Sequence, residues 1–140
     1  RAICVEMALA GASEITVVNI SEDGQILVDM LDQHTPTNAS FVLWDHLFNI
    51  PADTDIVINA TSVGLYPNVE QRLNINAVAD CIPNPAYTHF VKDAISKGCR
   101  HVLPGMNMLV NQAVIALKYW TGNDVDADIM RQELTRVLGL

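Results

Sequence analysis

Residues 55–59 constrain the fold of this chain most, because they form a short apolar run that ends in small polar residues. Ile56, Val57 and Ile58 lack the polar alternation of a half-exposed strand, so we expect a strand that is covered on both faces. Strands of this kind belong to parallel sheets with helices on both sides. The polar residues that begin at Asn59 then mark the sheet edge where such folds bind ligands.

The remaining pattern predicts helices and strands in alternation, which is typical of crossover units in a parallel sheet. We expect Ser21 to cap the second helix and Thr88 to cap the third, which Gly98 ends. The predicted strands are 15–19, 41–43, 55–59, 80–82 and 100–103, and the predicted helices are 2–10, a segment after Ser21 that carries Ile26, Leu27, Met30 and Leu31, then 90–97, 108–120 and 126–138.

The composition favours a globular domain and excludes several classes of function. The chain has 140 residues, of which 50% are hydrophobic and 17% are charged, so it can bury a core. Its formal net charge of −8 argues against nucleic acid as a partner, because such binding requires a basic surface. The sequence contains no apolar stretch of the roughly 20 residues that span a bilayer. We therefore expect one domain over residues 1–140, with no nucleic acid and no membrane.

The cysteines and histidines suggest neither a disulfide framework nor a metal site. Cys4, Cys81 and Cys99 are scattered and odd in number, which favours a reduced, cytoplasmic location. The four histidines are isolated from one another, and no cluster of Cys and His has the spacing of a zinc site.

The start of the chain is unusual for a fold of this class. Arg1 falls inside a predicted helix, with no strand before it. Nucleotide-binding parallel sheets open with a strand and a glycine-rich turn that leads into the first helix. We expect that this first strand and turn are missing from the sequence. The alternative is a domain that begins with a helix.

Two motifs, in this order, resemble the shikimate/quinate dehydrogenase family. The first is Asn-Ala-Thr-Ser-Val-Gly at residues 59–64, and the second is Gly-Met-Asn-Met-Leu-Val-Asn-Gln at residues 105–112. Residues 80–88 also match the family in outline. The resemblance implies an α/β fold with a Rossmann-like doubly wound parallel sheet flanked by helices. It also implies hydride transfer between NAD or NADP and a cyclic hydroxy acid, such as shikimate, 3-dehydroshikimate or quinate.

The resemblance also implies where the nicotinamide end of the cofactor binds. The turn of the first motif passes beside the nicotinamide ribose in the family, which assigns Thr61 and Ser62 to the cofactor. Cys81 occupies a position where the family contacts the nicotinamide, and Gly105 and Met108 complete this group. As alternatives, Thr61 and Ser62 could bond local backbone groups, and Cys81 could be a small buried hydrophobic residue.

Gln112 is the candidate substrate ligand. It shares an i, i+4 row with Met108, Ala116 and Trp120, so it is predicted to lie within an otherwise buried helix face. A buried amide without a partner costs about 1–3 kcal/mol, and this one therefore needs a partner. In the resembling family, a Gln here binds the hydroxyl or carboxylate of the substrate. The alternative is a bond to neighbouring backbone.

The segment after the strand at 15–19 suggests which cofactor is used. Family members that use NADP carry Asn-Arg-Thr there, and the Arg pairs with the 2′-phosphate. This chain has Asn19, no Arg, and two carboxylates, Glu22 and Asp23. A carboxylate accepts hydrogen bonds from a ribose 2′-hydroxyl and repels a phosphate. The sequence thus predicts NAD rather than NADP, with Glu22 as the leading ribose ligand; alternatively, these residues form only a helix cap.

The catalytic acid/base residues are not expected in this chain. In the family they are a Lys and an Asp of another domain, which we expect upstream of Arg1. Lys92, Lys97 and Lys118 fall on predicted helices, where they are expected to face solvent. The chain alone is therefore predicted to be inactive, with a homodimer as the candidate assembly of the whole protein. Pro83 stands where the family usually has Tyr, which removes a hydroxyl associated with substrate. The alternative function is a non-catalytic Rossmann-like nucleotide-binding or interaction module.

Overall fold

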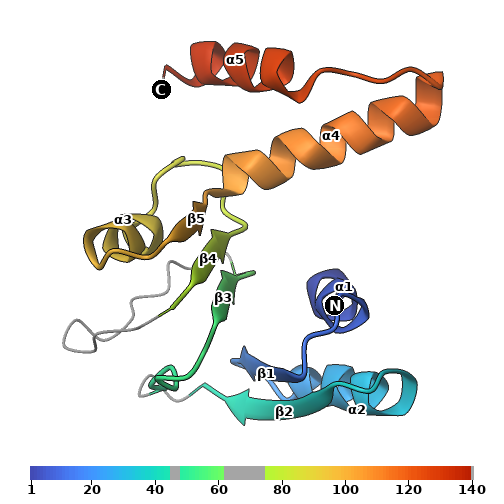
Figure 1. The fold of residues 1–140 in the computed structure, drawn as a ribbon, viewed down its shortest axis with the longest axis vertical. Coiled ribbons are helices and arrows are strands. Elements are labelled where there is room, and N and C mark those ends of the chain that lie inside the picture. The colour runs from blue at the N-terminus through green and yellow to red at the C-terminus, as the bar shows by residue number, and fades with distance from the viewer. Residues whose placement is uncertain (45–47, 62–74, 140) are drawn as a thin grey trace. The chain divides into compact units, whose positions relative to one another are not determined.

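The computed structural model describes residues 1–44, 48–61 and 75–139 (Figure 1). Contacts divide the chain into two compact units, Arg1–Phe48 and Asn49–Leu140. That residues 1–140 act as a single cofactor domain stays a prediction.

The first unit is a helix followed by a β-α-β crossover. Its elements are α1 (Ala2–Leu9), β1 (Glu14–Asn19), α2 (Asp23–His34) and β2 (Asn38–Leu43). Strands β1 and β2 are parallel, with Glu14 opposite Asn38 and Asn19 opposite Leu43. Apolar side chains of both helices and both strands form the core, which centres on Ala8, Leu27 and Leu31. The crossover predicted from the alternation of helix and strand is confirmed here.

The start of α2 differs from the prediction. Glu22 is the N-cap residue and makes no side-chain capping hydrogen bond, so the prediction that Ser21 caps this helix is wrong. The Ser21 hydroxyl instead donates to Asp23 Oδ2 at 3.1 Å and accepts from Asn19 Nδ2 at 3.2 Å. A capping serine uses its oxygen to accept a backbone N–H, and here that oxygen accepts from the Asn19 amide instead.

Close packing explains the glycine in the first turn of α2. Gly24 is buried, and a Cβ atom placed on it would lie 2.4 Å from Cε2 of Phe41 on β2. The helix can therefore approach the strand so closely only because residue 24 has no side chain.

The described part of the second unit carries a three-stranded parallel sheet. In the described part of this unit the strand order is β3 (Ile56–Asn59), β4 (Ala77–Asp80) and β5 (His101–Leu103). Register runs from Ile56 opposite Ala77 to Asn59 opposite Asp80. The three arrowheads in Figure 1 point the same way, toward the start of α4. The helices of this unit are α3 (His89–Ser96), α4 (Gly105–Thr121) and α5 (Ala127–Leu138).

Most helices and strands of the second unit match the prediction, and the predicted capping residues lie at the two ends of α3. Thr88 caps α3 by accepting a hydrogen bond from Val91 N, and Gly98 follows the helix with φ of 76°. The core of this unit centres on Ile75, Val78 and Phe90. The parallel α/β organisation predicted from the sequence is thus confirmed.

Three predictions for the second unit need correction. The strand predicted at 80–82 is Ala77–Asp80, because the Asp80 side chain captures the Ile82 N–H and turns the chain out of the sheet. Ile56 is 44% exposed, so β3 is not covered on both faces in the described structure. Helix α4 begins at Gly105 rather than at residue 108.

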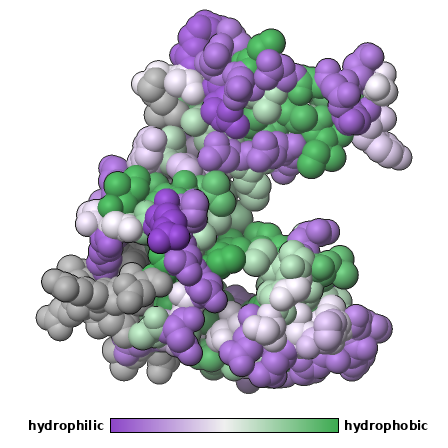
Figure 2. All heavy atoms as spheres, viewed as in Figure 1, coloured by the Kyte–Doolittle hydropathy of each residue, from purple (hydrophilic) through white to green (hydrophobic). Residues whose placement is uncertain are grey.

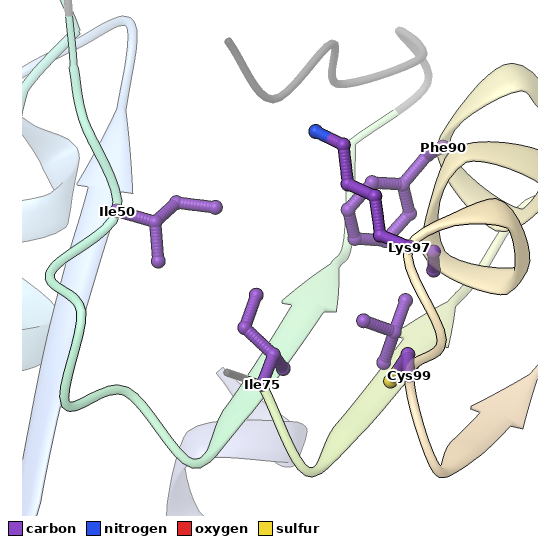
Figure 3. Close-up of a pocket in the computed structure, with 7 residues that line it drawn as sticks. Ile50, Ile75, Phe90, Lys97 and Cys99 are labelled. Carbon is purple, nitrogen blue, oxygen red and sulfur yellow. The ribbon is translucent and has the colours of Figure 1, made fainter. Parts of the chain in front are cut away.

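A small apolar cavity lies inside the second unit (Figure 3). Its volume is about 20 Å³, which is room for about one water molecule. Ile75 and Cys99, which line it, precede β4 and β5, so the cavity lies toward the amino ends of these strands. Parallel sheets bind ligands at the opposite edge, and we therefore do not assign this cavity to a site.

Replacement of Gly24 by alanine tests the packing of α2 on β2. Helix propensity alone favours Ala over Gly by about 1 kcal/mol, whereas a clash with Phe41 reverses the sign. We expect Gly24→Ala to lower the free energy of unfolding by about 1–3 kcal/mol, as measured by urea denaturation.

The second substitution Phe41→Leu should recover part of that loss by vacating the space that the new methyl group needs. A stabilised Gly24→Ala protein would contradict the packing that the structure shows.

Candidate functional site

The candidate site is the edge of the second unit's sheet where β3, β4 and β5 end. Because these strands are parallel, their carboxyl ends meet there. Thr61 follows β3, Cys81 follows β4, and Gly105 follows β5. The structure therefore brings these three predicted cofactor residues to one edge, which is where open α/β sheets place their ligands.

A buried carboxylate organises this edge. Asp80, the last residue of β4, is 2% exposed. It accepts hydrogen bonds from Asn59 Nδ2 at 3.2 Å, from Ile82 N at 3.0 Å and from Thr88 Oγ1 at 2.5 Å. A buried charge is tolerated when such donors replace water. Asp80 thus joins the end of β3, the chain after β4 and the start of α3.

Asn59 extends the network to the predicted cofactor turn. Asn59 is fully buried, and its Oδ1 accepts from Thr61 N at 3.1 Å and from Thr61 Oγ1 at 2.8 Å. The Thr61 hydroxyl therefore has a local partner, but this partner is the Asn59 side chain and not the backbone group that the alternative named. Ser62, the other predicted cofactor residue of this turn, lies outside the described residues.

Sequence reasoning missed the roles of Asn59 and Asp80. The available signal was two polar residues at the ends of two predicted strands, Asn59 at 55–59 and Asp80 at 80–82. In adjacent parallel strands, such residues are brought together at one edge. The strand order needed to pair them, β3 beside β4, is given by the structure.

Gly105 is required by the approach of α4 to the chain after β4. A Cβ atom on Gly105 would lie 2.3 Å from the carbonyl oxygen of Ile82 and 2.8 Å from its amide nitrogen. These are backbone atoms, so they cannot move aside as a flexible side chain can. The structure thus gives Gly105 a packing role, and its contact with a cofactor stays a prediction.

Cys81 is half-buried and carries a perturbed thiol. Burial raises the pKa of this thiol, and the adjacent carboxylate of Asp80 raises the pKa further. Cys81 is accordingly a neutral thiol at pH 7 rather than a reactive thiolate. Its backbone N–H bonds the Asn59 carbonyl at 2.9 Å, which continues the link between β3 and β4.

The prediction that Gln112 lies in a buried helix face is wrong for the described structure. Gln112 is exposed, as are its row neighbours Met108 and Trp120, the latter by 74%. Within α4, whose residues are all described, the buried residues are Gly105 and Val110. Figure 2 shows hydrophobic residues at the surface of the α4–α5 region among hydrophilic ones. A helical period groups residues on a face, but packing decides whether that face is covered.

The predicted ribose ligands lie together in the first unit. Asn19 ends β1, Glu22 is the N-cap residue of α2, and Asp23 lies in its first turn. Glu22 and Asp23 are exposed. Both interpretations of this segment, a helix start with favourable charges and a ribose site, agree with these positions.

Three further observations on the described residues concern membrane spans, metal sites and the lysines. No helix in the described part of the chain has both the length and the apolar character that a membrane span requires. No group of three or more His, Cys, Asp or Glu side chains within residues 1–44, 48–61 and 75–139 is placed to hold a metal ion. Lys92 is exposed, and the exposed Lys118 pairs with Asp124 at 2.6 Å.

Comparison with known proteins places this chain among dehydrogenases. The family model described as the shikimate 5′-dehydrogenase C-terminal domain matches residues 105–135. The shikimate dehydrogenase (NADP(+)) of Methanococcus aeolicus is 33% identical over 99% of this chain and 51% of its own length.

Two solved structures extend the comparison. The 5-ketofructose reductase of Gluconobacter sp. is 40% identical with a TM-score of 0.86, over 97% of this chain and 52% of that one. The quinate dehydrogenase of Corynebacterium glutamicum, solved in complex with NAD, is 26% identical with a TM-score of 0.80, over 99% and 51%. The chain spans about half the length of these relatives.

The perturbed thiol predicts a loss of stability at alkaline pH. The pKa of Cys81 in the folded protein lies above the ordinary thiol value of 9.0, so its stabilising contribution is present below that pH. It is lost as the pH rises through the folded value. Urea denaturation across this range should therefore show a steeper loss of unfolding free energy in the native protein than in Cys81→Ala.

The variant Cys99→Ala is a control for the loss of a thiol elsewhere in the same unit. If the native protein and Cys81→Ala have the same pH dependence, the buried environment assigned to Cys81 is incorrect.

Proposed function

Because the chain belongs to the shikimate/quinate dehydrogenase family as its C-terminal domain, we propose that it supplies the cofactor half of an oxidoreductase. The reaction is hydride transfer between a nicotinamide cofactor and a cyclic hydroxy acid such as shikimate or quinate. The observation that supports this most directly is the convergence of Thr61, Cys81 and Gly105 on the carboxyl edge of one parallel sheet. The task of such an edge is to hold and align the nicotinamide ring.

Gln112 is the proposed substrate ligand on this side of the reaction. Its exposed amide lies one helical turn beyond Met108 and can both donate and accept hydrogen bonds. It can therefore bind either a ring hydroxyl or a carboxylate. The acid/base pair, a Lys and an Asp, is proposed to come from outside this chain.

A keto sugar is the second candidate substrate. This chain is 40% identical to the Gluconobacter 5-ketofructose reductase and 26% identical to the Corynebacterium quinate dehydrogenase over comparable lengths. In addition, Pro83 stands where the family resemblance expects a substrate-associated Tyr. Loss of that hydroxyl favours a substrate with a different set of polar groups.

The substrate class is tested by assaying the whole protein with shikimate, quinate and 5-ketofructose, each with NAD(H) and NADP(H). We expect turnover of a ring hydroxy acid, and none from the 140 residues alone. Gln112→Ala should raise the KM for that substrate about tenfold, since the lost hydrogen bond faces a polar or charged group, and should leave the cofactor KM unchanged.

The matched control is Asn111→Ala, which removes the exposed amide of the adjacent residue. Turnover of 5-ketofructose alone would select the second candidate. Turnover by the isolated chain would place the acid/base residues within it and contradict the proposed division of roles.

We further propose that the cofactor is NAD. The exposed carboxylates of Glu22 and Asp23 stand at the carboxyl end of β1, and they suit a ribose 2′-hydroxyl better than a phosphate. Relatives do not agree on this point, because the Methanococcus enzyme is named for NADP(+) and the Corynebacterium structure contains NAD. The argument for NAD therefore rests on the residues of this chain.

Cofactor preference is measured as the ratio of kcat/KM with NAD to kcat/KM with NADP. We expect this ratio to exceed one and to fall about tenfold in Glu22→Ala, because hydrogen bonds to charged groups contribute about 1.5–3 kcal/mol. Glu14→Ala removes an exposed carboxylate at the opposite end of β1 and should leave the ratio unchanged. A preference for NADP in the native protein would refute the assignment.

A cytoplasmic location and a homodimeric assembly stay predictions from the sequence.

A further inference from the structure

The hydrogen bonds at the sheet edge define which atom of Asn59 faces which partner. A carboxylate can only accept hydrogen bonds. The Asn59 atom that lies 3.2 Å from Asp80 Oδ1 must therefore be the amide nitrogen. The amide oxygen is then directed to Thr61, where it meets the backbone N–H at 3.1 Å. Both contacts lead to the same orientation of the amide.

This orientation also fixes the direction of the hydrogen bond to the Thr61 hydroxyl. An amide oxygen only accepts, so the hydroxyl that lies 2.8 Å from Asn59 Oδ1 must donate its single proton. Whatever else it contacts, the Thr61 hydroxyl can meet a ligand only as an acceptor. A flipped amide would set two acceptors against each other at Asp80 and two donors at Thr61 N, and this is costly because Asn59 and Asp80 are buried.

We propose that Asp80 and Asn59 are positioning residues that make Thr61 an obligate hydrogen-bond acceptor for the cofactor. The matching ligand group is a hydroxyl donor of the nicotinamide ribose. This inference rests on the proposed function, because it takes Thr61 as a cofactor ligand. Asp80 and Asn59 act through Thr61 and are not themselves catalytic residues.

Kinetics of the whole protein test the role of Thr61. Thr61→Val keeps the shape of the side chain but removes the acceptor, so we expect the KM for the cofactor to rise about five- to tenfold. Thr61→Ser keeps the hydroxyl and should stay within about twofold of the native KM. Thr54→Val makes the same change in a half-exposed threonine before β3 and should leave the KM unchanged.

A double-mutant cycle tests whether Asn59 acts through Thr61. Asn59→Ala should raise the cofactor KM by about as much as Thr61→Val, and the double variant should be no worse than either single variant, because both remove the same contact. Purely structural damage would instead give additive losses. If Asn59→Ala does not fold, the contrast between Thr61→Val and Thr61→Ser decides the question.

The outcomes separate this inference from the function on which it rests. If the native whole protein neither binds a nicotinamide cofactor in calorimetry nor uses one, both proposals fail. If it uses the cofactor but Thr61→Val has the native KM, the inference about Thr61 fails and the function stands. Additive losses in the cycle would overturn the positioning role of Asn59.

Discussion

The carboxylate of Asp80 is the constraint on which the second unit depends. A charge buried at the end of β4 is stable only where donors replace the water it has lost. Among the described residues those donors are Asn59, Ile82 and Thr88, and each belongs to a different segment. The same carboxylate therefore aligns β3 with β4, ends β4 and places the start of α3. Removal of Asp80 would take this acceptor away from three donors in an interior where each lost hydrogen bond is costly.

Close approach at a glycine is the second constraint, and among the described residues each unit contains one such contact. Gly24 lets α2 reach Phe41 on β2, and Gly105 lets α4 reach the backbone of Ile82. The two contacts differ in how they would respond to a larger side chain at the glycine. The Phe41 ring near Gly24 can rotate or be replaced by mutation, whereas the Ile82 backbone near Gly105 cannot. At Gly105 the contact also holds α4 against the residue whose N–H is bound by Asp80. The helix that carries Gln112 is thus tied to the hydrogen-bond network at the carboxyl edge of the sheet.

The sequence predicts the positions of helices and strands in this chain better than the burial and hydrogen-bond partners of their side chains. Thr88 and Gly98 are correctly predicted as the ends of α3, because capping depends on local chemistry that a few residues determine. The end of β4 is mispredicted because the Asp80 side chain binds the Ile82 N–H, and the cap of α2 is mispredicted because the Ser21 oxygen accepts from Asn19 Nδ2 rather than from a backbone N–H. The burial of Gln112 is mispredicted because periodicity identifies a face of α4 but not what packs on it. The network of Asn59 and Asp80 depends on strand order, which local pattern does not give.

These observations define what the described residues would contribute to the proposed hydride transfer. The sheet edge offers Thr61 as an acceptor, Gln112 as an exposed amide on the helix that follows, and a close-packed backbone at Gly105. Cys81, the titratable side chain next to Asp80, has a raised pKa and is a poor base near neutral pH. The groups assembled at this edge therefore suit binding and alignment rather than proton transfer. This chain would then align the cofactor, and the proposed Lys and Asp outside the chain would transfer the proton. The two tasks can be separated because hydride transfer depends on the alignment of two rings, and the proton can be transferred by groups on the opposite side of the substrate.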